Sequence, residues 1–320
     1  MRRLFLLGLL LAAPASAIGQ PHADYRGKPA SEWIAQLADE DVRTRWFATY
    51  ALGQIGPEAV KAVEPLGRIL ADQYEYEYVR GGAAWALGRI GPGAGPAVPL
   101  LIETLQSKHV SVRRNAPVAL GNIGPAAKPA VGDLVKLLDD DDRGVRVNAA
   151  AALWKIDRHE RAIPTLVDIT QHGTGTGPYK AVVALGSLGP EAEPAVPAMV
   201  ESLGHPDQDA ARAAARALGQ IGPATIPAVQ EALAAAEEAV RRYAVEALGW
   251  IGPPAVPALV EALKNDQSSV RVLAARALGR LGPASEPARP ALIQAVDDPD
   301  PQVRAAAARA IGRIGPIAEG

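Results

Sequence analysis

Ala-Leu-Gly-Gln-Ile-Gly-Pro, at residues 51–57, is the first copy of a seven-residue motif that returns along most of the chain. Written as Ala-Leu-Gly-x-Ile/Leu-Gly-Pro, it recurs at 51–57, 86–92, 119–125, 184–190, 217–223, 247–253, 277–283 and, with Ile for Leu, 310–316. A degraded copy stands at 152–157. The central Leu or Ile residues lie 30 to 35 positions apart. A period of this length is typical of a solenoid.

Each repeat predicts two helices. The first begins with Pro and Ala, as at 96–105, because Pro is tolerated in a first helical turn. An acidic turn such as 297–300 then provides carboxylates that cap the second helix. The motif lies in this second helix and ends it, since Gly adopts the left-handed conformation and Pro prevents continuation. The nine expected repeats are 31–56, 58–91, 94–124, 127–157, 160–189, 192–222, 225–252, 255–282 and 286–315.

The N-terminus resembles a secretory signal peptide. Arg2 and Arg3 precede an apolar run at 4–13, and Ala15-Ser16-Ala17 follows. We therefore expect a signal peptide at 1–17, a polar lead at 18–30, the solenoid at 31–316 and a tail at 317–320. The protein is expected to be exported to the periplasm, cell envelope or extracellular space. The apolar run is too short for a permanent membrane span, so no stable membrane insertion is expected after cleavage.

Composition excludes several classes of site. The chain has 320 residues, a net charge of −2 and no cysteine. The charge gives no bulk attraction to nucleic acid, and we expect no nucleic-acid partner. The absence of cysteine excludes disulfides, thiolate catalysis and Cys-ligated zinc.

Stacking the nine copies on the central Leu, here called position 0, separates a buried face from an exposed one. Position −4 and position −1 are Ala in every copy, and these columns lie on the same helical face as position 0. Position −7 is Arg in seven copies: Arg45, Arg80, Arg113, Arg146, Arg241, Arg271 and Arg304. Because position −7 lies at the edge of the buried face, we interpret this column as an internal ladder rather than a ligand site.

The opposite face, at positions −9, −6, −5, −2 and +2, varies between repeats. It is aromatic in the first two repeats and becomes basic towards the C-terminus. We predict that it binds a partner through Trp46, Phe47, Tyr50, Tyr78, Trp85, Asn115, Asn148, Arg212, Arg216, Arg242, Tyr243, Trp250, Arg276, Arg280, Arg309 and Arg313.

The repeated Val-Arg, Ala-Ala and Ala-Leu-Gly-x-Ile-Gly-Pro pattern resembles the HEAT repeat, and within it the PBS-lyase HEAT-like variety. The resemblance covers about 31 to 316. It implies an all-α fold: a right-handed α-solenoid of the ARM/HEAT type with about nine antiparallel helix pairs. It also implies that the second helices line the concave side. Family members are mostly scaffolds that bind proteins, whereas some handle phycobilins and some are di-iron hydroxylases.

The hydroxylases bind iron through several His-Glu pairs, and this chain has one, His159-Glu160. We therefore predict no catalytic residues, no metal site and no cofactor. The acidic run at 139–142 is interpreted as a helix cap, and Gly173-x-Gly175-x-Gly177 as a loop. The stretch 157–180 lacks the usual motif elements and is the expected irregularity in the array.

The sequence thus predicts a non-enzymatic scaffold that binds an extended or acidic protein segment in its concave groove. Two alternatives stay open. One is an enzyme or enzyme accessory of the phycobilin-lyase-like or deoxyhypusine-hydroxylase-like branch, and the other is a purely structural envelope spacer. The oligomeric state is not predicted.

Overall fold

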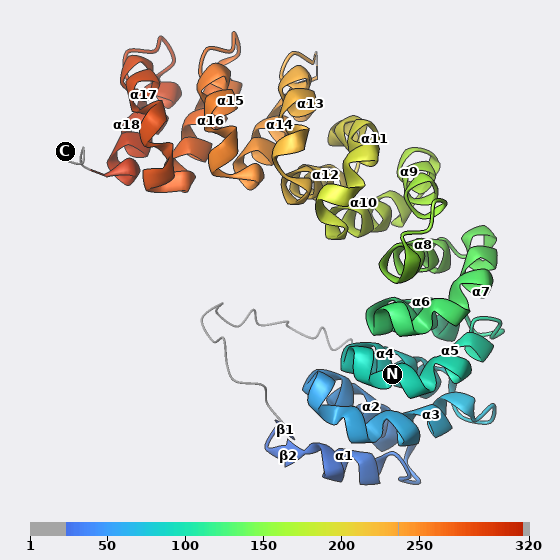
Figure 1. The fold of residues 1–320 in the computed structure, drawn as a ribbon. Helices are drawn as coiled ribbons and strands as arrows, with labels where there is room; N and C mark the ends of the chain where they lie inside the picture. The colour runs from blue at the N-terminus through green and yellow to red at the C-terminus, as the bar shows by residue number, and fades with distance from the viewer. Residues whose placement is uncertain (1–23, 236, 316–320) are drawn as a thin grey trace, which may run out of the picture.

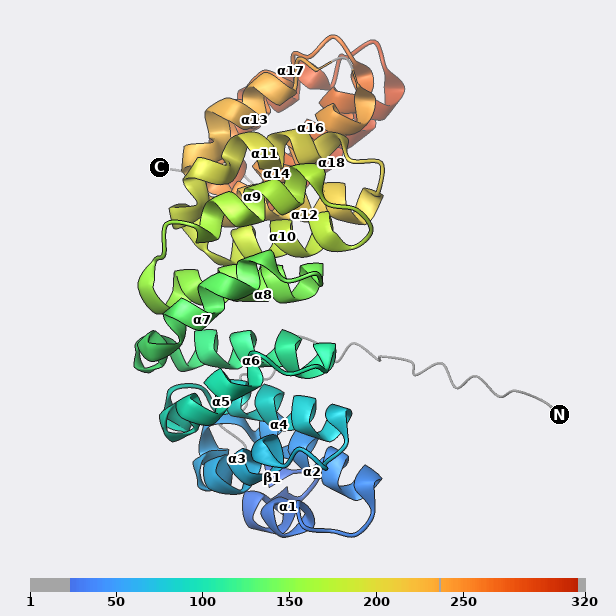
Figure 2. The ribbon, with the colours of Figure 1, turned by 90° about the vertical axis from the view of Figure 1, so that its right-hand side faces the viewer.

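The computed structural model describes residues 24–235 and 237–315, so the expected signal peptide and C-terminal tail lie outside the described residues. The helices stack pairwise into a curved array, with the even-numbered helices on the inner side of the arc and the odd-numbered helices on the outer side (Figure 1). Seen from the side, successive pairs lie one above another (Figure 2). The predicted α-solenoid of nine helix pairs is confirmed for this part of the chain.

The inner helices are mostly fourteen residues long and carry the motif. They are α2 (Val42–Ile55), α4 (Glu77–Ile90), α6 (Val110–Ile123), α8 (Arg143–Asp157), α10 (Gly177–Ser187), α12 (Gln208–Ile221), α14 (Glu238–Ile251), α16 (Ser268–Leu281) and α18 (Pro301–Ile314).

The outer helices are shorter. They are α1 (Ala30–Gln36), α3 (Val63–Ala71), α5 (Val98–Thr104), α7 (Val131–Lys136), α9 (Ala162–His172), α11 (Val196–Glu201), α13 (Ile226–Ala232), α15 (Val256–Ala262) and α17 (Arg289–Ala295). Seven of them follow a 3-10 segment that begins at the motif's Gly-Pro: Gly56–Ala62, Gly91–Ala97, Gly124–Ala130, Gly189–Ala195, Pro223–Thr225, Pro253–Ala255 and Gly282–Ala288. Two more 3-10 segments, Leu137–Asp139 and Ser202–Gly204, follow α7 and α11.

A short hairpin covers the N-terminal end of the array, within the stretch expected to be a polar lead. Strands β1 (Asp24–Tyr25) and β2 (Lys28–Pro29) pair antiparallel, with Asp24 opposite Pro29. The Tyr25 ring lies 6.2 Å from that of Trp33 in α1, and the Trp33 indole N–H donates to the Tyr25 carbonyl. The hairpin therefore closes the end of the core.

A continuous core runs along the stack from Trp33 to Ile314, as the columns predicted. The two glycines of the motif have different functions in it. The first lies between successive inner helices: a Cβ added to Gly121 or Gly279 would lie 3.0 Å from the Cα of Ala152 or Ala310. The second ends the helix at a positive φ, which favours glycine, as at Gly91 with φ 74°. The motif thus determines how closely the repeats pack and where each inner helix stops.

The arginine ladder at position −7 is structural, as predicted. Each of the seven side chains donates to a main-chain carbonyl near the end of the preceding outer helix; Arg113, for example, donates to Ser107 O at 2.7 Å. Three also pair with a carboxylate of the next repeat: Arg45 with Glu75, Arg113 with Asp140 and Arg271 with Asp298, at 2.6, 2.9 and 2.7 Å. The ladder therefore joins the two helices of each of these repeats, and three of its arginines also tie neighbouring repeats together.

The array is irregular around residues 157–180, as expected. Trp154 stands where the other copies have the first glycine, and its indole N–H donates to Glu191 at 3.0 Å. Arg158 caps the C-terminus of α8 in the left-handed conformation, with φ 51°, and α9 follows without a Gly-Pro segment. The next inner helix, α10, has only eleven residues.

Candidate functional site: the concave groove

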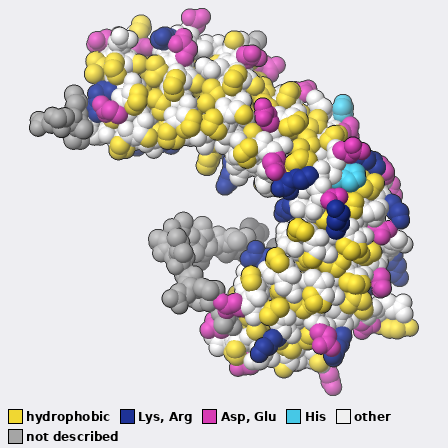
Figure 3. Space-filling model, viewed as in Figure 1, with side chains coloured by type: hydrophobic (Ala, Val, Ile, Leu, Met, Phe, Trp, Pro, Cys, Tyr) yellow, Lys and Arg dark blue, Asp and Glu magenta, His cyan; other side chains and the backbone are white. Residues whose placement is uncertain are grey.

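The inner face of the arc contains three kinds of surface. An aromatic patch lies on α2 and α4, a polar middle on α6 and α8, and a basic half on α12 to α18. Basic side chains are visible at the inner edge of the arc in Figure 3. Most of the predicted binding residues lie on this face, whereas Phe47, Asn148 and Tyr243 point towards neighbouring elements of the stack.

Phe47 and Tyr243 were predicted to be exposed, and the structure corrects both. The Phe47 ring lies 5.5 Å from Trp33 and 6.2 Å from Tyr25, beneath the hairpin. Tyr243 is 2% exposed, and its hydroxyl donates to Gln208 O of the preceding inner helix at 3.4 Å. Both occupy position −5, which points along the stack rather than into the groove: Phe47 faces the hairpin and α1, and Tyr243 faces the preceding inner helix.

The same orientation explains the two asparagines of the middle section, which are also at position −5. Asn148 Nδ2 donates to the carbonyl of Arg114 in the preceding repeat at 2.8 Å. Asn115 Nδ2 donates to Ser111 O in its own helix at 3.1 Å. Both side chains are half-buried. Asn148 is therefore a tie between repeats, whereas Asn115 also lines a hollow in the aromatic patch.

The aromatic patch consists of Trp46, Tyr50, Tyr78 and Trp85. Trp46 and Tyr50 stack with ring centroids 6.1 Å apart and planes 20° apart, and Tyr50 stacks on Trp85 at 5.5 Å and 6°. Three rings from two helices therefore form one parallel row. Trp46 and Tyr78 are 42% and 43% exposed, so the patch is open to solvent.

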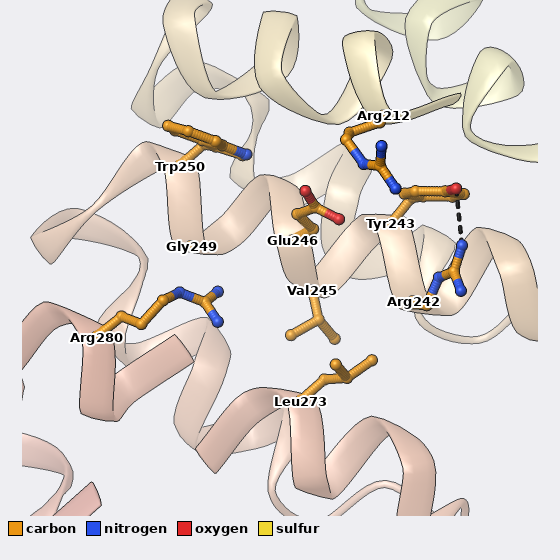
Figure 4. A pocket seen from close by; sticks show the side chains of 9 residues that line it. All are labelled: Arg212, Arg242, Tyr243, Val245, Glu246, Gly249, Trp250, Leu273 and Arg280. Carbon is orange, nitrogen blue, oxygen red and sulfur yellow. Dashed lines mark hydrogen bonds between the residues drawn. The ribbon is translucent and has the colours of Figure 1, made fainter. Parts of the chain in front are cut away.

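The basic half contains a hollow of about 570 Å³ between α12, α14 and α16. Figure 4 shows Arg212, Arg242 and Arg280 around it, with Trp250 and Glu246. Trp250 is 52% exposed, and the Arg216 guanidinium lies 5.3 Å from its ring centroid. Arg242 lies 4.5 Å from the Tyr243 ring and donates to its hydroxyl at 2.7 Å. Buried Tyr243 thus positions Arg242 instead of offering its own surface.

Four arginines on the last two inner helices form a cluster that we call the arginine quartet: Arg276, Arg280, Arg309 and Arg313. They surround a hollow of about 300 Å³ with a floor of small residues: Ala275, Gly279, Ala306 and Ala310. All four side chains are exposed. Within residues 24–235 and 237–315, none of them makes an ion pair or a hydrogen bond. By contrast, Arg212 has an acidic neighbour, Asp209, at 3.6 Å.

Several residues of the groove were not predicted from the sequence. Tyr179 and Val183 in α10 are 42% and 45% exposed and line a hollow of about 560 Å³ with Arg212 and Arg216. They occupy positions −6 and −2, the same columns as Trp46 and Arg216, so their exposure follows from the same helical pattern. Thr49, Gly81, Gly82 and Ser111 also line the aromatic patch, and their small size gave no signal.

The histidines of the described chain are dispersed. His109 lies 2.5 Å from Glu77, His172 lies 3.1 Å from Asp168, and His159 accepts from the Arg161 N–H. No group of three or more His, Asp or Glu side chains in this part of the chain is arranged to hold a metal ion. In addition, none of its helices has the length and apolar character that crossing a bilayer requires.

Several solved structures resemble the fold. The Kap95:Nup1 complex matches with a TM-score of 0.55 at 14% sequence identity, over 89% of this chain and 44% of that chain. An engineered protein matches with a TM-score of 0.40 at 26% identity, over 89% and 88% of the two chains. Human deoxyhypusine hydroxylase in complex with glycerol matches with a TM-score of 0.32 at 23% identity, over 80% and 96%. No curated protein matches the sequence.

The sequence itself matches the family of HEAT repeats. The matches span residues 30–121, 75–133, 98–186, 196–271 and 256–319, which together include nearly the whole solenoid. The chain therefore belongs to the HEAT-repeat family.

Proposed function

We propose that this HEAT-repeat solenoid is a non-enzymatic scaffold that binds an extended, acidic protein segment in its concave groove. The arginine quartet carries the proposal. Arg276 and Arg280 are four residues apart on α16, and Arg309 and Arg313 are four apart on α18. Like charges at this spacing destabilise a helix by about 0.2–0.5 kcal/mol per pair. Binding of an anionic ligand would offset this repulsion, which explains why four arginines lie together on this surface.

Guanidinium groups are suited to carboxylates, because each can donate two parallel hydrogen bonds to one carboxylate. The small floor residues leave room for a ligand to approach the helix backbones. The net charge of −2 means that attraction of an acidic ligand is local to the groove and does not come from the whole molecule.

The length of the groove favours an extended segment. Exposed side chains follow one another from Trp46 to Arg313 along successive inner helices, and solenoids use such concave surfaces for long contacts. The exposed aromatic side chains at the N-terminal end are suited to act as anchors for apolar groups of the same partner. The Kap95:Nup1 structure, which has a similar fold, is also a complex.

Capture of the native partner tests the proposal. Tagged protein is incubated with an envelope fraction of its native host, and the retained proteins are compared between wild type, Trp85→Ala and Arg276→Glu/Arg280→Glu. Wild type is expected to retain a partner protein that both variants lose. Equal retention by all three proteins would contradict it.

Export, the PBS-lyase HEAT-like subtype and the absence of enzymatic activity belong to the same proposal. Cleavage after Ala17 is checked by determining the N-terminus of the protein isolated from its host. The protein is proposed to work without nucleic acid, cofactor or stable membrane insertion. An absorption spectrum and metal analysis of the native protein check this, since a bound chromophore or stoichiometric metal would favour the enzymatic branch.

A further inference from the structure

The aromatic patch surrounds a separate hollow of about 290 Å³ that the acidic-segment proposal does not explain. Nine residues line it: Trp46, Thr49, Tyr50, Tyr78, Gly81, Gly82, Trp85, Ser111 and Asn115. None of them is charged, so this hollow differs chemically from the basic half of the groove. An acidic segment has no counter-charge here, and a basic segment has none either.

The walls of the hollow are closely packed. Trp46, Tyr50 and Trp85 stack in one row, and the six-membered ring of Trp85 lies where a Cβ on Gly53 would be. On the floor, a Cβ on Gly82 would meet Thr49 Oγ1. The hollow is therefore shaped before any ligand binds, which lowers the entropic cost of binding.

Several polar groups of the residues that line the hollow have no protein partner in the part of the chain that the structure describes. Within the described residues, the indole N–H groups of Trp46 and Trp85 and the hydroxyls of Tyr50 and Tyr78 have no acceptor. The Ser111 hydroxyl is buried and also has no partner. An indole N–H can only donate, whereas the hydroxyls can also accept, so the two indoles in particular require acceptors from a ligand or from water.

We propose that this hollow binds a proline-rich segment in the polyproline II conformation. Such a segment makes no internal hydrogen bonds, so its carbonyls are free to accept, and proline has no N–H that needs an acceptor. Its preformed helix loses little entropy on docking against aromatic side chains. A saccharide, by contrast, brings donors and acceptors together through each hydroxyl. The inference rests on the proposed function, because it assigns the aromatic end of the same groove to a proline-rich part of the partner.

Titration with peptides of defined composition tests this assignment. The probes are a labelled oligoproline of about nine residues, a Gly-Ser peptide of equal length and a neutral oligosaccharide. The variants are Trp46→Ala and Tyr78→Ala, whose side chains are both partly exposed, and the matched control is Trp250→Ala in the basic half. Circular dichroism confirms that each variant is folded.

Wild type is expected to bind oligoproline and not the Gly-Ser peptide. Each aromatic-patch variant should weaken oligoproline binding about tenfold or more, as expected for an anchor residue, and Trp250→Ala should change it less than about twofold. Failure of wild type to bind oligoproline, unchanged binding by both variants, or binding of the oligosaccharide instead would overturn the assignment.

A labelled poly-glutamate peptide, titrated in parallel, separates this inference from the proposed function. If poly-glutamate binds and oligoproline does not, the inference fails and the proposed function stands. If oligoproline binds and poly-glutamate does not, the acidic part of the proposed function fails alone. If neither binds, both are contradicted.

Discussion

Gly88 in α4 lies directly against Ala119 in α6: a Cβ on Gly88 would be 2.8 Å from the Cα of Ala119. The first glycine of the motif is required by the neighbouring helix, although it lies inside an α-helix where glycine is otherwise unfavourable. The stability of the array therefore depends on a contact that only two small residues permit.

Gly88→Ala is predicted to destabilise the protein by about 1–3 kcal/mol, because the added methyl group overpacks this contact. Gly312→Ala is the matched control, since the equivalent Cβ in the last repeat has nothing within 4 Å. There alanine should be neutral or stabilising by up to about 1 kcal/mol through its higher helix propensity. Urea unfolding measures both, and equal effects of the two substitutions would show that the contact is not limiting.

Asp298→Asn is predicted to lower the free energy of unfolding by about 1–3 kcal/mol, as expected for hydrogen bonds to a charged group. Asp298 accepts from Arg271 Nε at 2.7 Å and from Nη2 at 2.9 Å, and both side chains are largely buried. Asp297→Asn in the same turn is the control, because that side chain is exposed. If both variants lose the same free energy of unfolding, the ion pair between Arg271 and Asp298 does not specifically stabilise the contact between these repeats.

Asp142 should contribute to the pH dependence of stability. Hydrogen bonds from Arg114, at 2.5 and 2.8 Å, are the main cause that lowers the pKa of the Asp142 carboxyl to about 2. Because this is below the unfolded value of about 3.9, the contribution is present above about pH 4 and is lost as the pH falls towards 2.

Asp142→Asn should therefore be less stable than wild type at pH 7, and most of this difference should be lost as the pH falls to about 2. Asparagine also caps helices well, so the substitution leaves the cap on α8 and removes the charge. Thermal unfolding at both pH values measures the difference. A difference that persists unchanged at pH 2 would assign the effect to something other than the ionised carboxylate.

Arg309→Gln is predicted to stabilise the free protein by a few tenths of a kcal/mol at low salt, because it relieves repulsion within the arginine quartet. The gain should disappear at about 1 M salt, where the Debye length is about 3 Å. Arg68→Gln is the contrasting control, since Arg68 pairs with Glu64 at 2.6 Å on the outer layer. A loss of stability on removing Arg309 would show that the quartet is not strained in the free protein.

Repetition made the fold and the ladder predictable. Arg113 and its six equivalents occupy one column, and nine registers of the same pattern identified the buried face with little ambiguity. The residues of the groove were predicted less accurately, because the exposed positions were assigned from each helix in isolation. Phe47, Asn148 and Tyr243 point sideways at the preceding inner helix or the N-terminal cap, and this direction depends on how the helices stack.

Some residues of the site could not be recognised from their residue type. Residues 24–29 gave no strand signal, yet they form the hairpin that covers Phe47. Ser111 and the Gly81-Gly82 pair are small and uncharged, so nothing in their identity indicated that they line a hollow. These small residues form the hollow by leaving space unfilled. The shape of that space depends on the side chains of neighbouring repeats.

Binding of an acidic segment in the concave groove is tested most directly by the affinity of a labelled poly-glutamate peptide for two variants of equal charge. One replaces the arginine quartet with Gln, and the other replaces four exposed cations of the outer layer: Lys61, Arg68, Lys128 and Lys136. The quartet variant is predicted to bind at least about tenfold more weakly than wild type, while the outer variant stays within about twofold. Equal weakening of both variants, or no weakening of either, would contradict binding in the concave groove.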